Sequence, residues 1–218
     1  MPIEPLPTGS LIDRLARELR PVRRRAPWRE AALLLGLGAI ELGLFLGLGL
    51  MRPDMTAAMQ LPVFWWKLAS LGLIGLVGGA VTLFSLDPVR SPRPGLRWLA
   101  VLIAVCLGGG WLLDASREGL AALVGRLDWH HGLQCLGKIV ALSVPAVIAL
   151  GVVMRRGAPT DRAGTALAAG LAASGWGAFV FVFACPFDDP LYVAVWYSLG
   201  CGVVTLFARL VLPRLARW

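Results

Sequence analysis

The chain has 218 residues, of which 57% are hydrophobic and 16% are charged, and its net charge is +8 at pH 7. Soluble domains carry about 25% charged residues, so this composition and a mean hydropathy of +0.72 exclude an ordinary soluble domain. The positive charge would suit nucleic acid, but the basic residues follow the ends of apolar stretches and lack interleaved aromatic residues. We therefore expect no direct contact with nucleic acid.

Residues 1–28 form the first predicted unit, an N-terminal segment that lies outside the apolar part of the chain. A helix is predicted over residues 9–20, with one narrow apolar face. This face would lie either on anionic lipid headgroups or in the groove of a protein partner, and the sequence leaves both readings open. Four residues at helical spacing form the face: Leu11, Ile12, Leu15 and Leu19.

Residues 29–218 form the second predicted unit, which consists almost entirely of apolar stretches. A stretch of about 20 apolar residues, rising about 1.5 Å each, is long enough to cross the hydrocarbon layer of a bilayer. The predicted fold is therefore all-α, a polytopic membrane bundle of six transmembrane helices. The six spans are predicted near residues 30–51, 65–86, 96–114, 133–153, 163–184 and 191–212.

The distribution of basic residues predicts the orientation of this bundle. In a six-span arrangement, sixteen of the 21 Lys and Arg residues lie on one side, at both ends of the chain and in every second connection. The other connections and their flanks hold five. Because cytoplasmic segments of membrane proteins are enriched in Lys and Arg, we expect both termini to be cytoplasmic.

Among the charged residues of the predicted spans, Glu41, Lys67 and Lys138 are the candidates for a specific role. Glu41 lies near the centre of the first span, where a carboxyl group is costly unless it faces the bundle interior. It is a candidate functional residue, although a neutral glutamic acid bonded to a neighbouring helix is the simpler explanation. Lys67 follows the interfacial aromatic residues 64–66 and is expected to extend outward to water, and Lys138 lies on the same face.

Two of the four cysteines, Cys135 and Cys185, are predicted at the non-cytoplasmic ends of the fourth and fifth spans. Antiparallel neighbours at equal depth could bring them within the distance that a disulfide requires. Thiolate and imidazole ligands also suit soft metals, so a metal site is a second possibility, and packing of two unrelated small residues is a third. Four nearby side chains could support a metal: His130, His131, Asp188 and Asp189.

Other classes of membrane protein fit the sequence less well. A thiol oxidase would carry a Cys-x-x-Cys motif, which is absent from the sequence, and no phosphate-binding loop, zinc-protease motif or nucleophile elbow occurs. We therefore expect no enzyme and no certain cofactor. A small metal or ion transporter is the first alternative, although Glu41 and Pro145 are few polar or helix-breaking features for one. A membrane thiol-redox protein is the second alternative.

Several motifs together resemble the NrsF-like negative regulators of sigma factor F, over essentially the whole chain. These are the inward segment ending in Leu19 to Arg23, the aromatic-lysine start of the second span, and the single cysteine opening the fourth. The most specific motif is Cys185-Pro-Phe-Asp-Asp-Pro190 running into Val195-Trp-Tyr197, with Arg-Trp at the C-terminus.

The resemblance implies a multi-pass protein of the bacterial inner membrane that holds an extracytoplasmic-function sigma factor inactive. It also implies that paired outer cysteines, here Cys135 and Cys185, sense heavy-metal or oxidative stress. In that family a histidine often precedes the second cysteine, whereas this chain has Ala184. The expected partners are thus a sigma factor and the lipid bilayer, and a heavy-metal ion is a candidate inducer.

Overall fold

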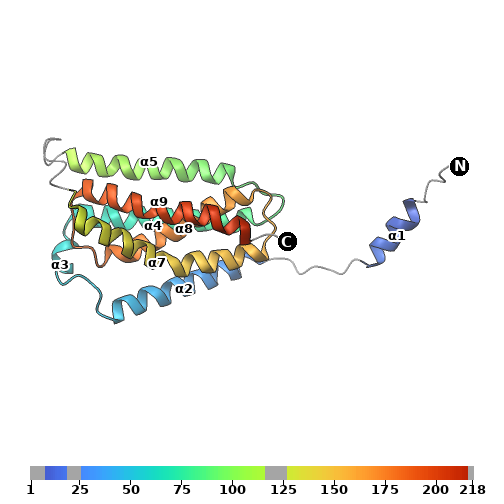
Figure 1. The fold of residues 1–218 in the computed structure, drawn as a ribbon, viewed down its shortest axis with the longest axis horizontal. Helices are drawn as coiled ribbons and strands as arrows, with labels where there is room; N and C mark the ends of the chain where they lie inside the picture. Colours follow the sequence, from blue (N-terminus) through green and yellow to red (C-terminus); the bar gives the residue numbers. More distant parts are fainter. Residues whose placement is uncertain (1–7, 19–25, 116–126, 216–218) are drawn as a thin grey trace.

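The computed structural model describes residues 8–18, 26–115 and 127–215, and this part of the chain is helical with no strands (Figure 1). In this part of the chain six long helices form a bundle, the short helix α3 follows the first of them, and α1 precedes the bundle. The helices are α1 (Thr8–Glu18), α2 (Pro27–Gly47), α3 (Met55–Ala58), α4 (Pro62–Ser85), α5 (Arg93–Ala115), α7 (Trp129–Arg156), α8 (Arg162–Val182) and α9 (Pro190–Leu215).

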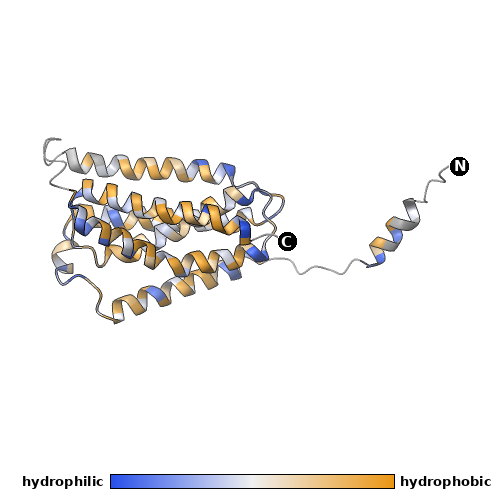
Figure 2. Cartoon of the chain, in the orientation of Figure 1, coloured by the Kyte–Doolittle hydropathy of each residue, from blue (hydrophilic) through white to orange (hydrophobic). Residues whose placement is uncertain are grey.

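The first helix confirms the predicted N-terminal helix over most of its length. α1 begins one residue before the predicted start, and its described part ends at Glu18, so residues 19 and 20 lie outside the described residues. Figure 1 shows α1 apart from the long helices of the bundle. Figure 2 shows that α1 mixes polar and apolar residues, whereas the bundle is mostly apolar.

Five of the described helices, α2, α4, α7, α8 and α9, are long and apolar enough to cross a membrane, by length and composition. The prediction of six such spans is therefore one too many for the described part of the chain. The third predicted span, residues 96–114, does form a helix, α5, which packs beside α4 and α9.

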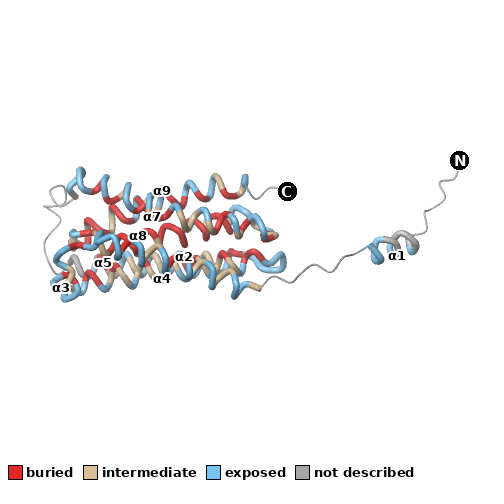
Figure 3. Tube along the Cα trace, turned by 90° about the horizontal axis from the view of Figure 1, so that it is seen from below, coloured by how far each residue is buried: buried red, intermediate tan, exposed pale blue. Residues whose placement is uncertain are grey.

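The centre of the bundle is α8, and small residues explain how the other helices approach it. Most of its residues are buried, and α4, α7 and α9 pack around it (Figure 3). Its glycines face different neighbours: Gly170 contacts α9, Gly175 meets Gly75 of α4, and Gly177 meets Ser143 of α7. A Cβ atom on Gly175 would lie 2.8 Å from the Gly75 nitrogen, so only glycine permits this close approach.

Local sequence explains where the long helices begin. Proline occupies the first turn of α2 and α4, where its missing N–H is not needed. Aspartates cap three later helices. Asp128 Oδ1 accepts from the His131 nitrogen, Asp161 Oδ1 accepts from the Gly164 nitrogen at 2.8 Å, and Asp189 Oδ1 accepts from the Leu191 nitrogen at 2.9 Å. The last cap fixes the turn between α8 and α9.

Two apolar clusters fill the interior of the bundle. One joins α4, α7, α8 and α9 and contains Cys135 and Cys185 together with Phe64, Tyr192 and Trp196. The other lies further along the same helices around residues 150–173 and 204–212. By contrast, α2 buries only Gly38 and Phe45, so it is the most loosely held of the five span-length helices.

Candidate functional site

The structure brings Cys135 and Cys185 together. Cys135 lies in the second turn of α7 and Cys185 lies in the connection between α8 and α9, and both are buried free thiols. Both belong to the same buried cluster, close enough for Cys135 to influence the ionisation of the Cys185 thiol. The sulfur of Cys135 also lies 3.3 Å from the Tyr192 hydroxyl. The expected proximity is therefore present.

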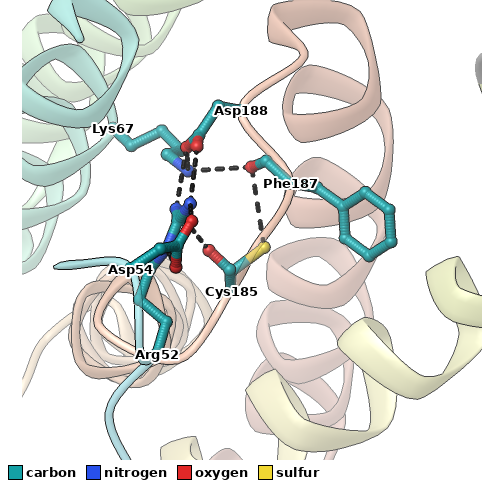
Figure 4. A network of polar contacts seen from close by, with 6 residues as sticks. All are labelled: Arg52, Asp54, Lys67, Cys185, Phe187 and Asp188. Atoms are coloured by element: carbon teal, nitrogen blue, oxygen red, sulfur yellow. Dashed lines mark hydrogen bonds and ion pairs between the residues drawn. The ribbon is translucent and has the colours of Figure 1, made fainter. Parts of the chain in front are cut away.

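A buried group of charges surrounds the turn that carries Cys185 (Figure 4). Arg52, from the connection between α2 and α3, places both terminal nitrogens on Asp188, at 3.1 and 2.9 Å. Lys67, from α4, donates to Asp188 Oδ1 at 2.8 Å. The two cations are 5% and 1% exposed. Buried charges are stable only when they are paired. By pairing with both cations, Asp188 links the α8–α9 connection to the α2–α3 connection and to α4. We call Arg52, Asp54, Lys67 and Asp188 the charge network.

Arg52 also holds the backbone of the cysteine turn. Its Nη1 atom donates to the carbonyl oxygen of Cys185 at 2.9 Å, and its own backbone nitrogen donates to Phe183 at 2.9 Å. On the solvent side it forms two bonds of 2.7 Å to Asp54. A bidentate guanidinium–carboxylate pair fixes orientation as well as charge. The position of the Cys185 carbonyl is therefore tied to the segment that follows α2.

Electrostatics in this turn favour the anionic forms of its acidic groups. The Arg52 side chain, as hydrogen-bond donor, lowers the pKa of Asp54 from 3.8 to about 2. Burial by itself would raise the pKa of Asp188, but the bonds from Arg52 and Lys67 outweigh it and hold the pKa below its usual value. The neighbouring Cys135 thiol, together with the charge of Lys67, lowers the pKa of the Cys185 thiol below its usual value, although burial by itself would raise it.

The residues predicted as metal support are engaged elsewhere. His130 and His131 are exposed; His131 Nδ1 lies 2.7 Å from Asp128 Oδ2, and His130 lies 3.2 Å from Gln134. Asp188 binds the two cations of the charge network, and Asp189 caps α9. Among the described residues, no group of three His, Cys, Asp or Glu side chains is placed to hold a metal ion.

The prediction that Lys67 extends outward to water is wrong. Its ammonium group is buried because Asp188 and the Phe187 carbonyl, both from the α8–α9 connection, bind it at 2.8 and 2.9 Å. Lys138 is exposed, and its ammonium lies 5.9 Å from the ring centre of Phe181. The two lysines thus differ sharply in their surroundings, although hydropathy assigned them to the same face.

Glu41 is bonded to a neighbouring helix, as the simpler of its two explanations requires. Its Oε2 atom accepts a hydrogen bond of 2.9 Å from Trp176 Nε1 of α8. The ring of Trp176 also packs on Gly38, one turn earlier in α2. This contact is a main attachment of the loosely packed α2 to the bundle.

The predicted docking face is described in part. Ile12 and Leu15 are 61% and 55% exposed, so two of its four apolar side chains are open to a partner or a surface. The side chain of Leu11 and all of Leu19 lie outside the described residues.

Sequence reasoning missed Arg52, the residue at the centre of the charge network. Arg-Pro-Asp at positions 52–54 follows a long apolar stretch, and this pairing of an arginine with a nearby carboxylate was the available signal. It also missed Trp176 as the partner of Glu41, because a tryptophan within an apolar stretch is ordinarily a packing residue.

Comparison with known proteins confirms the resemblance drawn from the motifs. The family model described as "Negative regulator of sigma F" (NrsF) matches residues 15–218. The anti-sigma-F factor NrsF of Caulobacter vibrioides is 33% identical over 213 residues, which cover 97% of this chain and 99% of that protein. The probable anti-sigma-F factor NrsF of Azospira oryzae is 29% identical over 217 residues, with the same coverage. No solved structure matches the chain significantly. The match with the family extends over nearly the whole chain, which therefore belongs to the NrsF family of negative regulators of sigma F.

Proposed function

We propose that this chain is a membrane-bound anti-sigma factor that sequesters an extracytoplasmic-function sigma factor and releases it under heavy-metal or oxidative stress. The observation that carries the proposal is membership of the NrsF family over residues 15–218. The apolar helices support a location in the bacterial inner membrane. The excess of Lys and Arg at the ends of the chain and in alternate connections supports cytoplasmic termini.

The N-terminal segment, residues 1–28, is the proposed binding element for the sigma factor. Ile12 and Leu15 are exposed on α1, and arginines flank them, so the helix offers an apolar face with a basic border. A partner groove with acidic edges would complement both features.

In this proposal, Cys135 and Cys185 sense the heavy-metal or oxidative stress. Oxidation of Cys135 and Cys185, or capture of a soft metal by their thiolates, would change the packing of the two side chains in their shared cluster and displace the turn between α8 and α9. Arg52 holds the Cys185 carbonyl and follows α2, the helix that leads back to the N-terminal segment. Because α2 is loosely packed, it is the element through which a change at the turn would reach the bound sigma factor.

The docking element is tested by a single charge on its apolar face. We expect Leu15→Asp to raise transcription from a sigma-dependent reporter in unstressed cells, while the protein remains in the membrane fraction. Val89→Asp is the matched control, because Val89 is also exposed and apolar but lies in the connection between α4 and α5. Unchanged repression by the Leu15→Asp protein would count against docking through α1.

The stimulus is tested by removing one thiol at a time. We expect Cys135→Ser and Cys185→Ser each to abolish the reporter's response to an oxidant or to cadmium without loss of the protein from the membrane. Cys106→Ser is the control, since Cys106 lies in α5 away from the pair. If both variants respond like the unmodified chain, the cysteines are not the sensor.

A further inference from the structure

The two cysteines of the pair have different surroundings. Cys185 shares a hydrogen-bond acceptor with a buried cation: its sulfur donates to the Phe187 carbonyl oxygen at 3.8 Å, and Lys67 Nζ donates to the same oxygen at 2.9 Å (Figure 4). The distance between sulfur and ammonium therefore cannot exceed the sum of these two. A cation this close to a thiol stabilises the thiolate, and low dielectric strengthens that attraction, while burial by itself opposes the charged form.

Among the described contacts Cys135 has no buried cation beside it, and the cation whose charge reaches it, Lys138, is exposed. Its sulfur lies against the Tyr192 hydroxyl at 3.3 Å, within the apolar cluster of the bundle. Lys138, three residues along α7, is exposed and lies over the Phe181 ring, 5.9 Å from its centre. The fold thus supplies one thiol with a fixed, buried ammonium group and the other with a neutral phenol.

We propose that Cys185 is the attacking thiol of the pair, that Cys135 is the resolving thiol, and that Lys67 is the positioning residue that sets this order. The proposal deepens the proposed function and rests on it for its biological role. The order of reaction itself is a property of the purified protein. The proposed order of the thiols can therefore be wrong although the protein is an anti-sigma factor. It can equally be right although the protein has another function.

With a small disulfide as oxidant, the reaction proceeds in two exchanges. The Cys185 thiolate attacks one sulfur of the disulfide, whose S–S bond breaks, and one half leaves as a thiolate. Cys135 then loses its proton to that leaving thiolate and attacks the sulfur of Cys185. The second half leaves as a thiolate and takes up a proton from solvent, in place of the one that Cys185 gave up. The protein gains one disulfide, and the oxidant is reduced to two thiols.

Charged and titratable groups reach Cys185 from every element around it, and a pH measurement reports on all of them together. They are Lys67 from α4, Arg52 from the α2–α3 connection, Cys135 from α7, Tyr192 and Tyr197 from α9, and Asp188 in the same turn. Lys67 is the group to vary. In a Lys67→Met protein Asp188 keeps both bonds to Arg52, so the turn retains its main attachment.

The test uses the full chain in mild detergent, with Cys106 and Cys201 replaced by serine so that only the pair remains. One protein then carries Cys135→Ser and retains Cys185, and the other carries Cys185→Ser and retains Cys135. Both react with dithiodipyridine, a small uncharged disulfide that releases a coloured product. A thiol whose pKa falls by one unit has about ten times more thiolate but lower nucleophilicity, a net gain of about threefold in rate.

We expect the protein that retains Cys185 to react at least about threefold faster at neutral pH. Its rate should also fall off at a lower pH than the rate of the protein that retains Cys135. Access to a buried thiol changes the rate at every pH alike, whereas the thiolate fraction changes the pH profile. Lys67→Met should shift the Cys185 profile to higher pH, Lys67→Arg should restore it, and Lys138→Met should leave it unchanged.

Two results would overturn the proposal. The first is that Cys135 reacts as fast as Cys185 or faster, and that the rates of the two proteins depend on pH in the same way. The other is a Cys185 profile that Lys67→Met does not move. If Lys67→Met does not fold, the comparison of the two pH profiles in the Lys67 protein decides the order, and Lys67→Gln, which keeps a hydrogen-bond donor but removes the charge, decides whether the cation matters. Co-purification of a sigma factor with the same proteins reports separately on the proposed function.

Discussion

Asp188 is the shared anion of the charge network, and its neutralisation is the sharpest test of that network's role in stability. Asp188→Asn keeps the shape of the side chain but leaves Arg52 and Lys67, whose side chains are 3% and 0% exposed, without a common counter-charge. Removing one partner of a buried ion pair costs about 3–5 kcal/mol. Arg52 keeps Asp54, and the Asp188 side chain is itself 15% exposed, so we expect about 3 kcal/mol, near the lower end of that range.

The measurement is thermal unfolding of the purified protein in mild detergent, followed by tryptophan fluorescence. For a chain of this size, about 3 kcal/mol lowers Tm by about 6 °C or more. Asp54→Asn is the matched control: its carboxylate also binds Arg52 but is 52% exposed, so its loss should matter far less. Adding Lys67→Met to Asp188→Asn should recover part of the loss, because it removes one unpaired cation. An Asp188→Asn protein that melts like the unmodified chain would refute this account of the turn.

Three further predictions follow from the packing and the charges. Gly175→Leu should destabilise the bundle strongly, because a Cβ at this position would lie 2.8 Å from the backbone of α4. Gly43→Leu should be tolerated, because nothing lies within 4 Å of a Cβ there. Thermal unfolding compares the Tm of the two variants. The Arg52–Asp54 pair should contribute fully to stability above pH 3.8 and lose its contribution as pH falls through about 2, so Tm should not fall between pH 7 and 5 on its account. Trp196→Phe should lower stability by about 1 kcal/mol, because the indole donates a 2.7 Å hydrogen bond to the Leu127 carbonyl, and chemical unfolding in detergent would detect it.

The helices were predictable because their signal is local. Each span-length stretch of apolar residues became a helix, and the predicted boundaries lie within four residues of the observed ones. The stretch predicted as the third span does form the helix α5, but α5 is not one of the five span-length apolar helices found among the described residues. The short helix α3 was not predicted, since four residues give no periodic pattern.

The candidate site was predictable only in part, because its contacts join distant segments. Equal depth at the ends of two spans was the signal that Cys135 could lie near Cys185, with a disulfide, a metal site and simple packing all left open. Nothing local indicated that Lys67 would turn inward, since its carboxylate partner, Asp188, lies 121 residues away in the sequence. For the same reason Asp188 was read as a metal ligand, when its charge is used to pair Arg52 and Lys67.

The most direct test of the central claim is to purify the tagged protein from its own host in mild detergent and identify what accompanies it. The account predicts a sigma factor with the full chain from reduced, unstressed cells, and its loss when residues 1–28 are deleted. A full chain that brings down no sigma factor under those conditions would contradict the anti-sigma function.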